Sequence, residues 1–275
     1  VVQTWHGSPM KRILLDALRD REDPRWYERL FEALQRRELQ GLRWIVALGE
    51  PDAAILRGAF ENQNVAITGY PKNDLLCESD THWSVAPRWK QRFDRVILYA
   101  PTFREHGMVA RPFSERGLTA LEAALAQRNW GLLVKRHPYD TSLTIPSGLE
   151  HVIDVTDETP DLQELLAETD LLITDYSSVF VDFLLCARPI VFYTYDHDEY
   201  VSQSRKMYYD LYDTLPGPFV TTEAELVERI LAVDTWAQEP AYLEGLAGMR
   251  RHFHRHLDGG ACERMHALLL GSQDA

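Results

Sequence analysis

Four short apolar runs of this sequence end in side chains that can bind a phosphate or move a proton. In chain order these are His6 after 1–5, Thr102 and Arg104 after 95–101, Lys135, Arg136 and His137 at the end of 130–137, and Asp175, Ser177 and Ser178 after 170–174. If the runs are parallel strands, their carboxyl ends lie at one edge of a sheet, where open α/β sheets bind ligands. Cations and hydroxyls there can hold a phosphate, and a histidine can take up a proton near neutral pH. The sequence therefore predicts an anion-binding active site at this edge.

The segment DYSS (175–178) leads directly into the apolar stretch VFVDFLL. A serine at a helix start caps free backbone N–H groups, and these groups together with the helix dipole attract an anion. We interpret Ser177 and Ser178 as a phosphate cradle, with Asp175 orienting this loop or a nearby histidine. The alternative for the segment taken alone is that a serine is only an N-cap and Asp175 only a turn residue.

Two histidines lie in turns that would present their rings to a ligand. His6 stands in TWHGSP, where Gly7 and Pro9 favour a tight turn, and an exposed imidazole suits a general base. His137 stands in KRHP, beside two cations that would stabilise charge on a leaving phosphate. The alternatives are a packed turn histidine for His6 and a solvated basic turn for His137.

Two further motifs are weaker, and neither predicts a metal site. Asp196 and Asp198 in YDHDEY have the DxD spacing of metal-dependent glycosyltransferases, but a solvated acidic loop is the favoured interpretation. His252 and His256 in HFHRH lack a third ligand and are interpreted as a surface helix face. The sequence has no GxGxxG and no Walker loop, which disfavours a dinucleotide or P-loop ATP enzyme. We expect no metal and no cofactor.

The apolar pattern alternates between strands and helices along the chain. The predicted strands are 1–5, 44–48, 64–69, 95–102, 130–137, 151–155, 170–174, 189–195 and 218–222. Between them, apolar residues recur at helical spacing, for example in RWYERLFEALQRREL and EAELVERILAV. Continuous apolar strands that alternate with amphipathic helices indicate an α/β fold with parallel sheets.

The polar stretch 71–94 contains prolines, has no strand pattern and marks the predicted domain boundary. We expect a partial N-terminal Rossmann-like domain with its linker at 1–88, a fuller Rossmann-like domain at 89–240 and helices at 241–275. The last segment is predicted to break at Gly259-Gly260. Because the sequence opens inside a strand, the first domain is expected to be incomplete.

Composition limits the partners and the compartment. The 275 residues are 45% hydrophobic and carry a formal net charge of −13, which disfavours nucleic acid as a partner. Three scattered cysteines and no span-length apolar run favour a cytoplasmic protein. Residues 11–43 carry nine basic and seven acidic side chains and would suit an anionic membrane surface. The favoured alternative for this segment is a helix pair that covers the N-terminal sheet.

Taken together, the motifs resemble the CDP-glycerol glycerophosphotransferase family, the polymerases and primases of teichoic acid and related capsule polymers. The matching segments are QTWHGSPMK, TGYPKNDLL, ILYAPTFR, KRHP, LLITDYSSVFVDFLLCARPIVFYTYDHDEY, RKMYYDLYDTLPGPFVTTEAEL and DGGACERM, in this order across nearly the whole chain. The resemblance implies a GT-B-like fold, with two Rossmann-like domains facing a cleft and no essential metal.

The resemblance also implies roles for individual residues. His6 of the WHG motif would be the base, His137 would bind or stabilise the donor phosphates, and Asp175, Ser177 and Ser178 would form the pyrophosphate site. Arg205 matches an arginine of a further family motif, although Lys206 follows it where glycine is usual. Lys72 stands where arginine is common, and Ser8 where threonine is frequent.

The resemblance implies attack by an acceptor hydroxyl on a CDP-linked alditol, with release of CMP. His137, Arg104, Ser177 and Ser178 would hold the diphosphate, and Asp182 would support the loop or touch the donor. Gly7, Thr102, Lys135 and Arg136 complete the predicted binding residues. The expected partners are CDP-glycerol or a similar CDP-alditol and a polyol phosphate or glycan acceptor, which a lipid would anchor at the inner face of the membrane. The alternatives are a nucleotide-sugar GT-B enzyme and a non-catalytic, polymer-binding half of a synthase.

Overall fold

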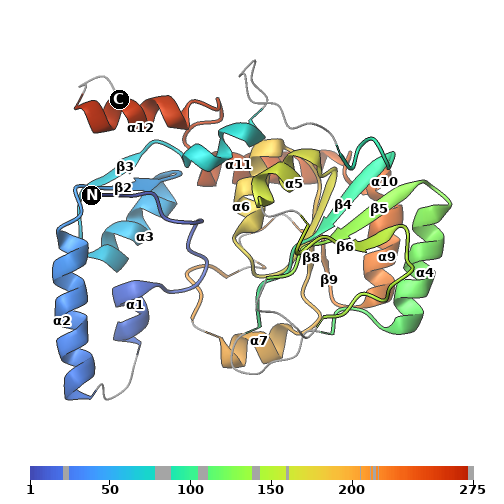
Figure 1. Ribbon diagram of the computed structural model, residues 1–275, viewed down its shortest axis with the longest axis horizontal. Helices are drawn as coiled ribbons and strands as arrows, with labels where there is room; N and C mark the ends of the chain where they lie inside the picture. The colour runs from blue at the N-terminus through green and yellow to red at the C-terminus, as the bar shows by residue number, and fades with distance from the viewer. Residues whose placement is uncertain are drawn as a thin grey trace.

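The structure is a computed structural model and describes residues 1–20, 25–77, 88–104, 111–137, 143–158, 161–204, 206–210, 212, 215 and 217–271. Its strands form two separate parallel sheets (Figure 1). The first sheet has the order β1-β2-β3, with strands Val2–Gln3, Trp44–Ala47 and Val65–Ile67. The second has the order β6-β5-β4-β7-β8-β9. Its strands are β4 (Arg95–Tyr99), β5 (Trp130–Val134), β6 (Val152–Asp154), β7 (Leu171–Thr174), β8 (Ile190–Tyr193) and β9 (Phe219–Val220).

Helices connect and cover these strands. In the first half of the chain they are α1 (Leu14–Arg19), α2 (Trp26–Gln40), α3 (Glu50–Phe60), the 3-10 helix η1 (Pro71–Leu76) and α4 (Glu115–Ala126). In the second half they are α5 (Leu162–Glu168), α6 (Val179–Phe183), the 3-10 helix η2 (Leu184–Cys186), α7 (His197–Gln203), α9 (Glu223–Leu231), α10 (Val233–Trp236), α11 (Pro240–Phe253) and α12 (Ala261–Leu270).

The first sheet buries both of its faces. Because side chains alternate along a strand, Ile45 and Ala47 of β2 point into a small core with α3, while Val46 and Leu48 point into the large core of the molecule. The large core also contains Phe253 at the end of α11. Burial on both faces explains why this strand has a continuous apolar sequence rather than an alternating one.

The second sheet is the larger one, and its middle strands are fully buried. Figure 1 shows α4 and α9 on one side of this sheet and α5 and α6 on the other. The chain passes from β4 outward to β5 and β6 and then returns past β4 to β7, β8 and β9. This strand order is that of a Rossmann fold, which confirms the predicted fold class.

The C-terminal helices connect the two halves of the molecule. After α11 ends at Phe253, the Arg255 N–H donates to the carbonyl of Leu48 at 3.0 Å. The Asp74 carboxylate accepts from the backbone N–H groups of Ala261 and Cys262 at the start of α12, at 2.9 and 2.8 Å. The predicted break between the two helices is confirmed, and α12 packs on η1 and thus on the first domain (Figure 1).

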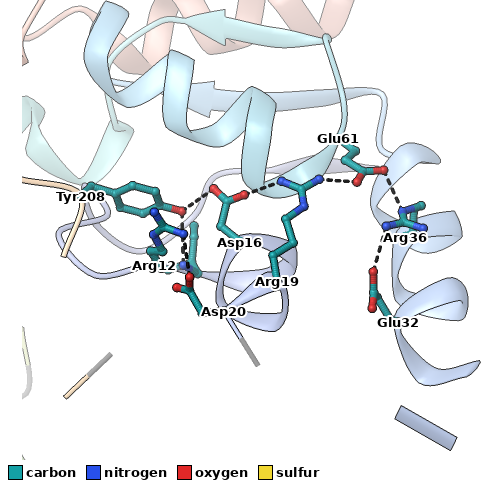
Figure 2. A network of polar contacts seen from close by, with 9 residues as sticks. Arg12, Asp16, Arg19, Asp20, Glu32, Arg36, Glu61 and Tyr208 are labelled. Atoms are coloured by element: carbon teal, nitrogen blue, oxygen red, sulfur yellow. Dashed lines mark hydrogen bonds and ion pairs between the residues drawn. The ribbon is translucent and has the colours of Figure 1, made fainter. Parts of the chain in front are cut away.

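The prediction that residues 11–43 form a helix pair covering the sheet is wrong for most of α2. None of its residues is buried, and Trp26, Leu30, Phe31 and Leu34 are all more than half exposed. Figure 2 shows how the opposite side of α2 is held: Arg36 pairs with Glu32 and with Glu61 beyond α3, and Glu61 pairs in turn with Arg19 of α1. Polar contacts therefore hold most of α2, and near its end Leu39 packs against the small core as the prediction expected. The apolar side of the rest of the helix faces outward.

The sequence predicted every described strand, although each is shorter than expected. It did not predict α3 or α7. The acidic run 196–199 was interpreted as a solvated loop, but Asp196 has only 11% of its side chain exposed, and the residues after it form α7.

Candidate functional site

A cleft of about 470 Å³ lies between the two domains. Its second-domain wall is made by the loops after β4, β5 and β7, and its first-domain wall by residues 5–11 after β1. The chain reverses direction across the sheet between β4 and β7, so the loops after these two strands diverge and leave a crevice. The cleft thus has the position that the sequence predicted. The predicted residues that line it are His6, Gly7, Thr102, Lys135, Arg136, His137, Ser177 and Ser178.

His6 is exposed on the first-domain wall, and its ring packs against Trp5 with centroids 4.6 Å apart. Trp5 has a φ of 53°, a left-handed conformation that is costly for a large side chain and often marks a functional turn. Neighbouring protein atoms desolvate the imidazole and lower its pKa, and the charge of Lys72 lowers that pKa further. A lowered pKa keeps His6 neutral at physiological pH, which is the form that accepts a proton.

Lys72 reaches this position through a buried polar cluster between the domains. Its Nζ lies 2.5 Å from Asp182 Oδ2, and Asn73 Nδ2 donates to Asp182 Oδ1 at 2.7 Å. Gln163 of α5 donates to the same carboxylate at 3.2 Å. Asp182 therefore fastens η1 of the first domain onto α5 and α6 of the second.

Asp182 does not line the cleft. Its contacts agree with the first of the two predicted roles, support of the loop, and contact with the donor stays a prediction. Asn73 and Gln163 were not predicted. The signal that could have found Asn73 is the polar run in GYPKND, which follows a strand and in which Asn73 and Asp74 are buried. Gln163 lies within an ordinary helical pattern, which carries no such signal.

The basic turn after β5 forms part of the second-domain wall. Lys135 Nζ donates to the carbonyl of Thr156 at 2.8 Å, and the Arg136 guanidinium donates to Asp154 at 2.7 and 2.9 Å. His137 is exposed, with its ring 5.0 Å from that of Phe103. Both cations are thus held by residues at the end of β6 and just after it, and His137, the next residue of the turn, is exposed.

The serine loop after β7 faces the His6 loop directly. Ser177 Oγ accepts from the Val179 N–H at 3.3 Å, whereas Ser178 makes no capping hydrogen bond. The alternative that Ser178 is only an N-cap is therefore wrong, since Ser178 already has helical backbone angles and makes no capping bond to α6. A Cβ added to Gly7 would lie 2.9 Å from Ser178 Oγ, so glycine is what allows the two loops to approach so closely.

Asp175 lies beneath the cleft and is fully buried. Its Oδ1 accepts from the N–H and the hydroxyl of Thr102 at 2.8 and 2.7 Å, and from the Tyr176 N–H at 2.6 Å. These bonds join the loop after β4 to the loop after β7. These bonds agree with the interpretation that Asp175 orients the loop, and since Asp175 does not line the cleft, its contact with the donor stays a prediction.

Arg104 also lies beneath the cleft, where it is buried and does not line it, so its contact with the diphosphate stays a prediction. Its guanidinium pairs with Asp175 at 2.8 Å and with Asp196 at 2.7 Å, and it lies against the rings of Tyr176 and Tyr200. Burial opposes its charge, but the two carboxylates outweigh burial and raise its pKa. Both the arginine and the first aspartate of the DxD-like motif are therefore structural.

Arg205 lies outside the described residues. The histidine motif near the C-terminus is also corrected, because only His252 lies on the exposed side of a helix. His254 is buried with Nε2 2.7 Å from the carbonyl oxygen of Val181, and His256 lies beyond α11 with Nε2 3.2 Å from that of Ile67. Among the described residues, no three His, Cys, Asp or Glu side chains come together as a metal site would require.

Two parallel-sheet domains that face a cleft give the chain a GT-B-like fold, with a histidine on one wall of the cleft and a histidine, cations and hydroxyls on the other. The chain belongs to the CDP-glycerol:poly(glycerophosphate) glycerophosphotransferase family, whose model matches residues 1–271.

Individual relatives agree with this assignment. The chain is 31% identical to a teichoic acid glycerol-phosphate transferase of Staphylococcus aureus, over 96% of this chain and 69% of that protein. It is 31% identical to a teichoic acid poly(glycerol phosphate) polymerase of Bacillus spizizenii, over 86% of this chain and 62% of that protein. It spans 32% of the corresponding polymerase of Bacillus subtilis.

Solved structures agree as well. The wall teichoic acid polymerase TagF superimposes with a TM-score of 0.78 at 27% identity, over 98% of this chain and 67% of that one. A histidine-to-asparagine variant of TagF soaked with CDPG superimposes with a TM-score of 0.80, with the same identity and coverage.

Proposed function

We propose that this chain transfers glycerol phosphate from CDP-glycerol to a hydroxyl group of a teichoic-acid-like polymer and releases CMP. The observation that carries the proposal is the pair of facing walls: His6 and Gly7 come from one domain, and Lys135, His137, Ser177 and Ser178 from the other. The family and the TagF structure soaked with CDPG support the choice of donor.

In the proposed reaction, an acceptor hydroxyl attacks the β-phosphorus of CDP-glycerol. His6 takes the proton of that hydroxyl as the new P–O bond forms. The bond from the β-phosphorus to the oxygen that bridges the two phosphates breaks, and CMP leaves with this oxygen. Lys135 and His137 neutralise the charge that develops on CMP, and the hydroxyls of Ser177 and Ser178 hold the phosphates. Positioning and charge neutralisation of this kind supply most of the catalysis in phosphoryl transfer.

A CDP-ribitol donor is the second candidate. The chain is 31% identical to a teichoic acid poly(ribitol-phosphate) polymerase of Bacillus spizizenii, over 74% of this chain and 33% of that protein. Both donors present the same cytidine and diphosphate to the second-domain wall, so the polyol is selected elsewhere in the cleft.

Thermal unfolding with CDP-glycerol, CDP-ribitol, CMP and UDP-sugars tests the donor site. A ligand present at about 100 times its Kd stabilises the native state by about 2.7 kcal/mol. We expect cytidine ligands alone to raise the Tm, and Ser177→Ala to reduce this shift. A shift with UDP-sugars would favour a nucleotide-sugar enzyme, and no shift with any ligand would favour a polymer-binding module.

We further propose that the protein works at the inner face of the cell membrane, with α2 as its contact. Trp26, Tyr27, Leu30, Phe31 and Leu34 form one exposed apolar side of this helix. Arg25 and Arg29 are exposed on the same helix, and such cations attract anionic headgroups. Among the described residues, no helix is long and apolar enough to cross a bilayer.

Co-sedimentation with vesicles tests this contact. Each large apolar side chain contributes about 1.5–3 kcal/mol when it is buried, so Leu30→Gln with Phe31→Gln should weaken binding to anionic vesicles more than tenfold. Leu269→Gln with Leu270→Gln on α12 is the matched control, because these leucines are also exposed. Equal binding by both double variants would contradict the role of α2.

A further inference from the structure

A second pocket, of about 420 Å³, lies beside the cleft. Apart from Tyr176 of the serine loop and Arg12 of the first domain, its lining comes from α7 and the residues that follow α7. Four aromatic rings and two cations form much of its lining: Tyr176, Tyr200, Tyr209, Tyr212, Arg12 and Lys206.

The cleft and the second pocket share a wall. Tyr176 lines both spaces, and its ring stacks on that of Tyr200 with centroids 3.8 Å apart. The rest of the wall is a backbone bridge between the domains, where the Arg12 N–H donates to the carbonyl of Lys206 and the Tyr208 N–H to that of Met10, both at 2.8 Å. Lys11 lines the cleft and its neighbour Arg12 lines the second pocket.

The lining suits a polyol phosphate chain, which carries one negative phosphate and at least one hydroxyl per repeat. Arg12 and Lys206 bring two cations to the lining that can contact phosphate oxygens; both also pair with the Asp20 carboxylate, at 2.8 and 3.2 Å (Figure 2 shows Arg12 with Asp20). The Asp210 carboxylate in the lining can accept hydrogen bonds from hydroxyl groups, and the rings offer flat surfaces to the carbon backbone.

We propose that this second pocket is an acceptor subsite, which holds a polyol phosphate segment of the growing chain while its terminal hydroxyl lies in the cleft beside His6. The inference rests on the proposed function for the identity of the polymer. In the proposed function the donor binds to the loops after β4 and β7, which line the cleft. The second pocket is lined by Arg12 of the first domain, which is the acceptor side, so we assign it to the acceptor.

Val201 offers a clean test, because it lines the pocket from α7 and is 52% exposed, so its substitution leaves the core intact. The probe is a soluble oligo(glycerol phosphate), titrated by calorimetry at low salt. We expect Val201→Glu to weaken its binding roughly fivefold through repulsion of the phosphates, and Val201→Gln to change it less than twofold. Leu243→Glu on α11 is the control, since it adds the same charge at an exposed site outside the pocket. Donor binding, followed as the Tm shift with CDP-glycerol, should be unchanged in all three variants.

The outcomes separate the subsite from the proposed function. Equal weakening by Val201→Glu and Leu243→Glu would overturn the subsite, as would wild-type protein that responds to CDP-glycerol but does not bind the oligomer. A wild-type protein that binds the oligomer in a Val201-dependent way without responding to CDP-glycerol would retain the subsite and contradict the transferase. Loss of both responses would overturn both.

Discussion

Each wall of the cleft is supported from behind by a buried carboxylate, and the two carboxylates are held differently. In the proposed function the second-domain wall binds the donor and the first-domain wall, with His6, faces the acceptor; we call them the donor wall and the acceptor wall. Asp175, behind the donor wall, receives hydrogen bonds from two loops and pairs with the buried Arg104. Asp52, behind the His6 loop, receives the Leu48 N–H and the Tyr70 hydroxyl, both at 2.9 Å, but pairs with no cation among the described residues. Ser8 Oγ is buried near this carboxyl group, but the two do not form a hydrogen bond.

Whether a cation pairs with the carboxylate determines whether Asp175 or Asp52 is charged. Burial raises the pKa of Asp52 to about 6, and its hydrogen bonds offset only part of this rise. The donor wall thus rests on an ion pair, and the acceptor wall rests on a group that protonates at mildly acidic pH. We infer that the donor wall is stable over a wide pH range, whereas the His6 loop is sensitive to pH.

The largest effect on stability is expected from removing the cation behind the donor wall. Arg104→Gln leaves Asp175 buried without its ion pair, and breaking such a pair costs about 3–5 kcal/mol. Urea unfolding measures this loss. Arg95→Gln is the control, because its partner Asp234 is mostly exposed and such a surface pair contributes less than about 1 kcal/mol. Similar losses in the two variants would contradict the contrast between buried and exposed pairs.

The free energy of unfolding should depend on pH because of Asp52, behind the acceptor wall. Because the native state holds the Asp52 proton more tightly than the unfolded state, it binds more protons between pH 4 and 6, and stability falls as pH rises through this window. The shift corresponds to a loss on the order of 2–3 kcal/mol. Asp52→Asn should lack this component, so its stability relative to wild type should rise from pH 4 to 6 and then level off. A difference between the two proteins that does not change with pH would show that Asp52 is charged throughout.

A smaller effect is expected where the two walls touch. Gly7→Ala pushes a methyl group against Ser178 Oγ, so donor affinity should fall about fivefold, or roughly 1 kcal/mol. In a double-mutant cycle with Ser178→Ala, the second substitution should relieve this clash and give a coupling energy of about 0.5–1 kcal/mol. Additive effects would mean that the two loops do not restrict one another.

The smallest expected effect is a shift of the pH–rate profile. The charge of Lys72 contributes to the lowered pKa of His6, after the partial desolvation of the ring by neighbouring protein atoms. Lys72→Gln should therefore move the acidic limb of the profile to higher pH, because His6 then protonates more readily. Lys72→Arg keeps the charge and should leave the limb in place. Identical profiles for the two variants would show that Lys72 does not influence the base.

Sequence reasoning located the cleft because its residues follow strands, and strand ends are local features. It identified His6, His137, Ser177 and Ser178 as residues at this edge, and the structure places all four in the cleft lining. It could not separate residues that face the cleft from those beneath it. Asp175 and Arg104 follow strands like the others, but their partner Asp196 is distant in sequence, so their burial is a tertiary property.

The outward side of α2 was missed for a related reason. Its apolar spacing predicts an amphipathic helix equally well whether the apolar side is buried or exposed. The ion pairs of Arg36 and Glu61 determine which side faces the protein (Figure 2), and they join residues 25 positions apart. The domain boundary stretch also looked unstructured, although its first part forms η1 and carries the Lys72 and Asn73 contacts to Asp182.

The most direct test of the central claim measures CMP release and CDP-glycerol binding in the same His6→Asn protein, with oligo(glycerol phosphate) as the acceptor. His6 stands on the acceptor wall and the donor phosphates are assigned to the other wall, so the account predicts a rate reduced about 10²–10⁴-fold with an unchanged Tm shift by CDP-glycerol. A variant that keeps the wild-type rate, or that loses the CDP-glycerol shift together with the rate, would contradict this division of the cleft.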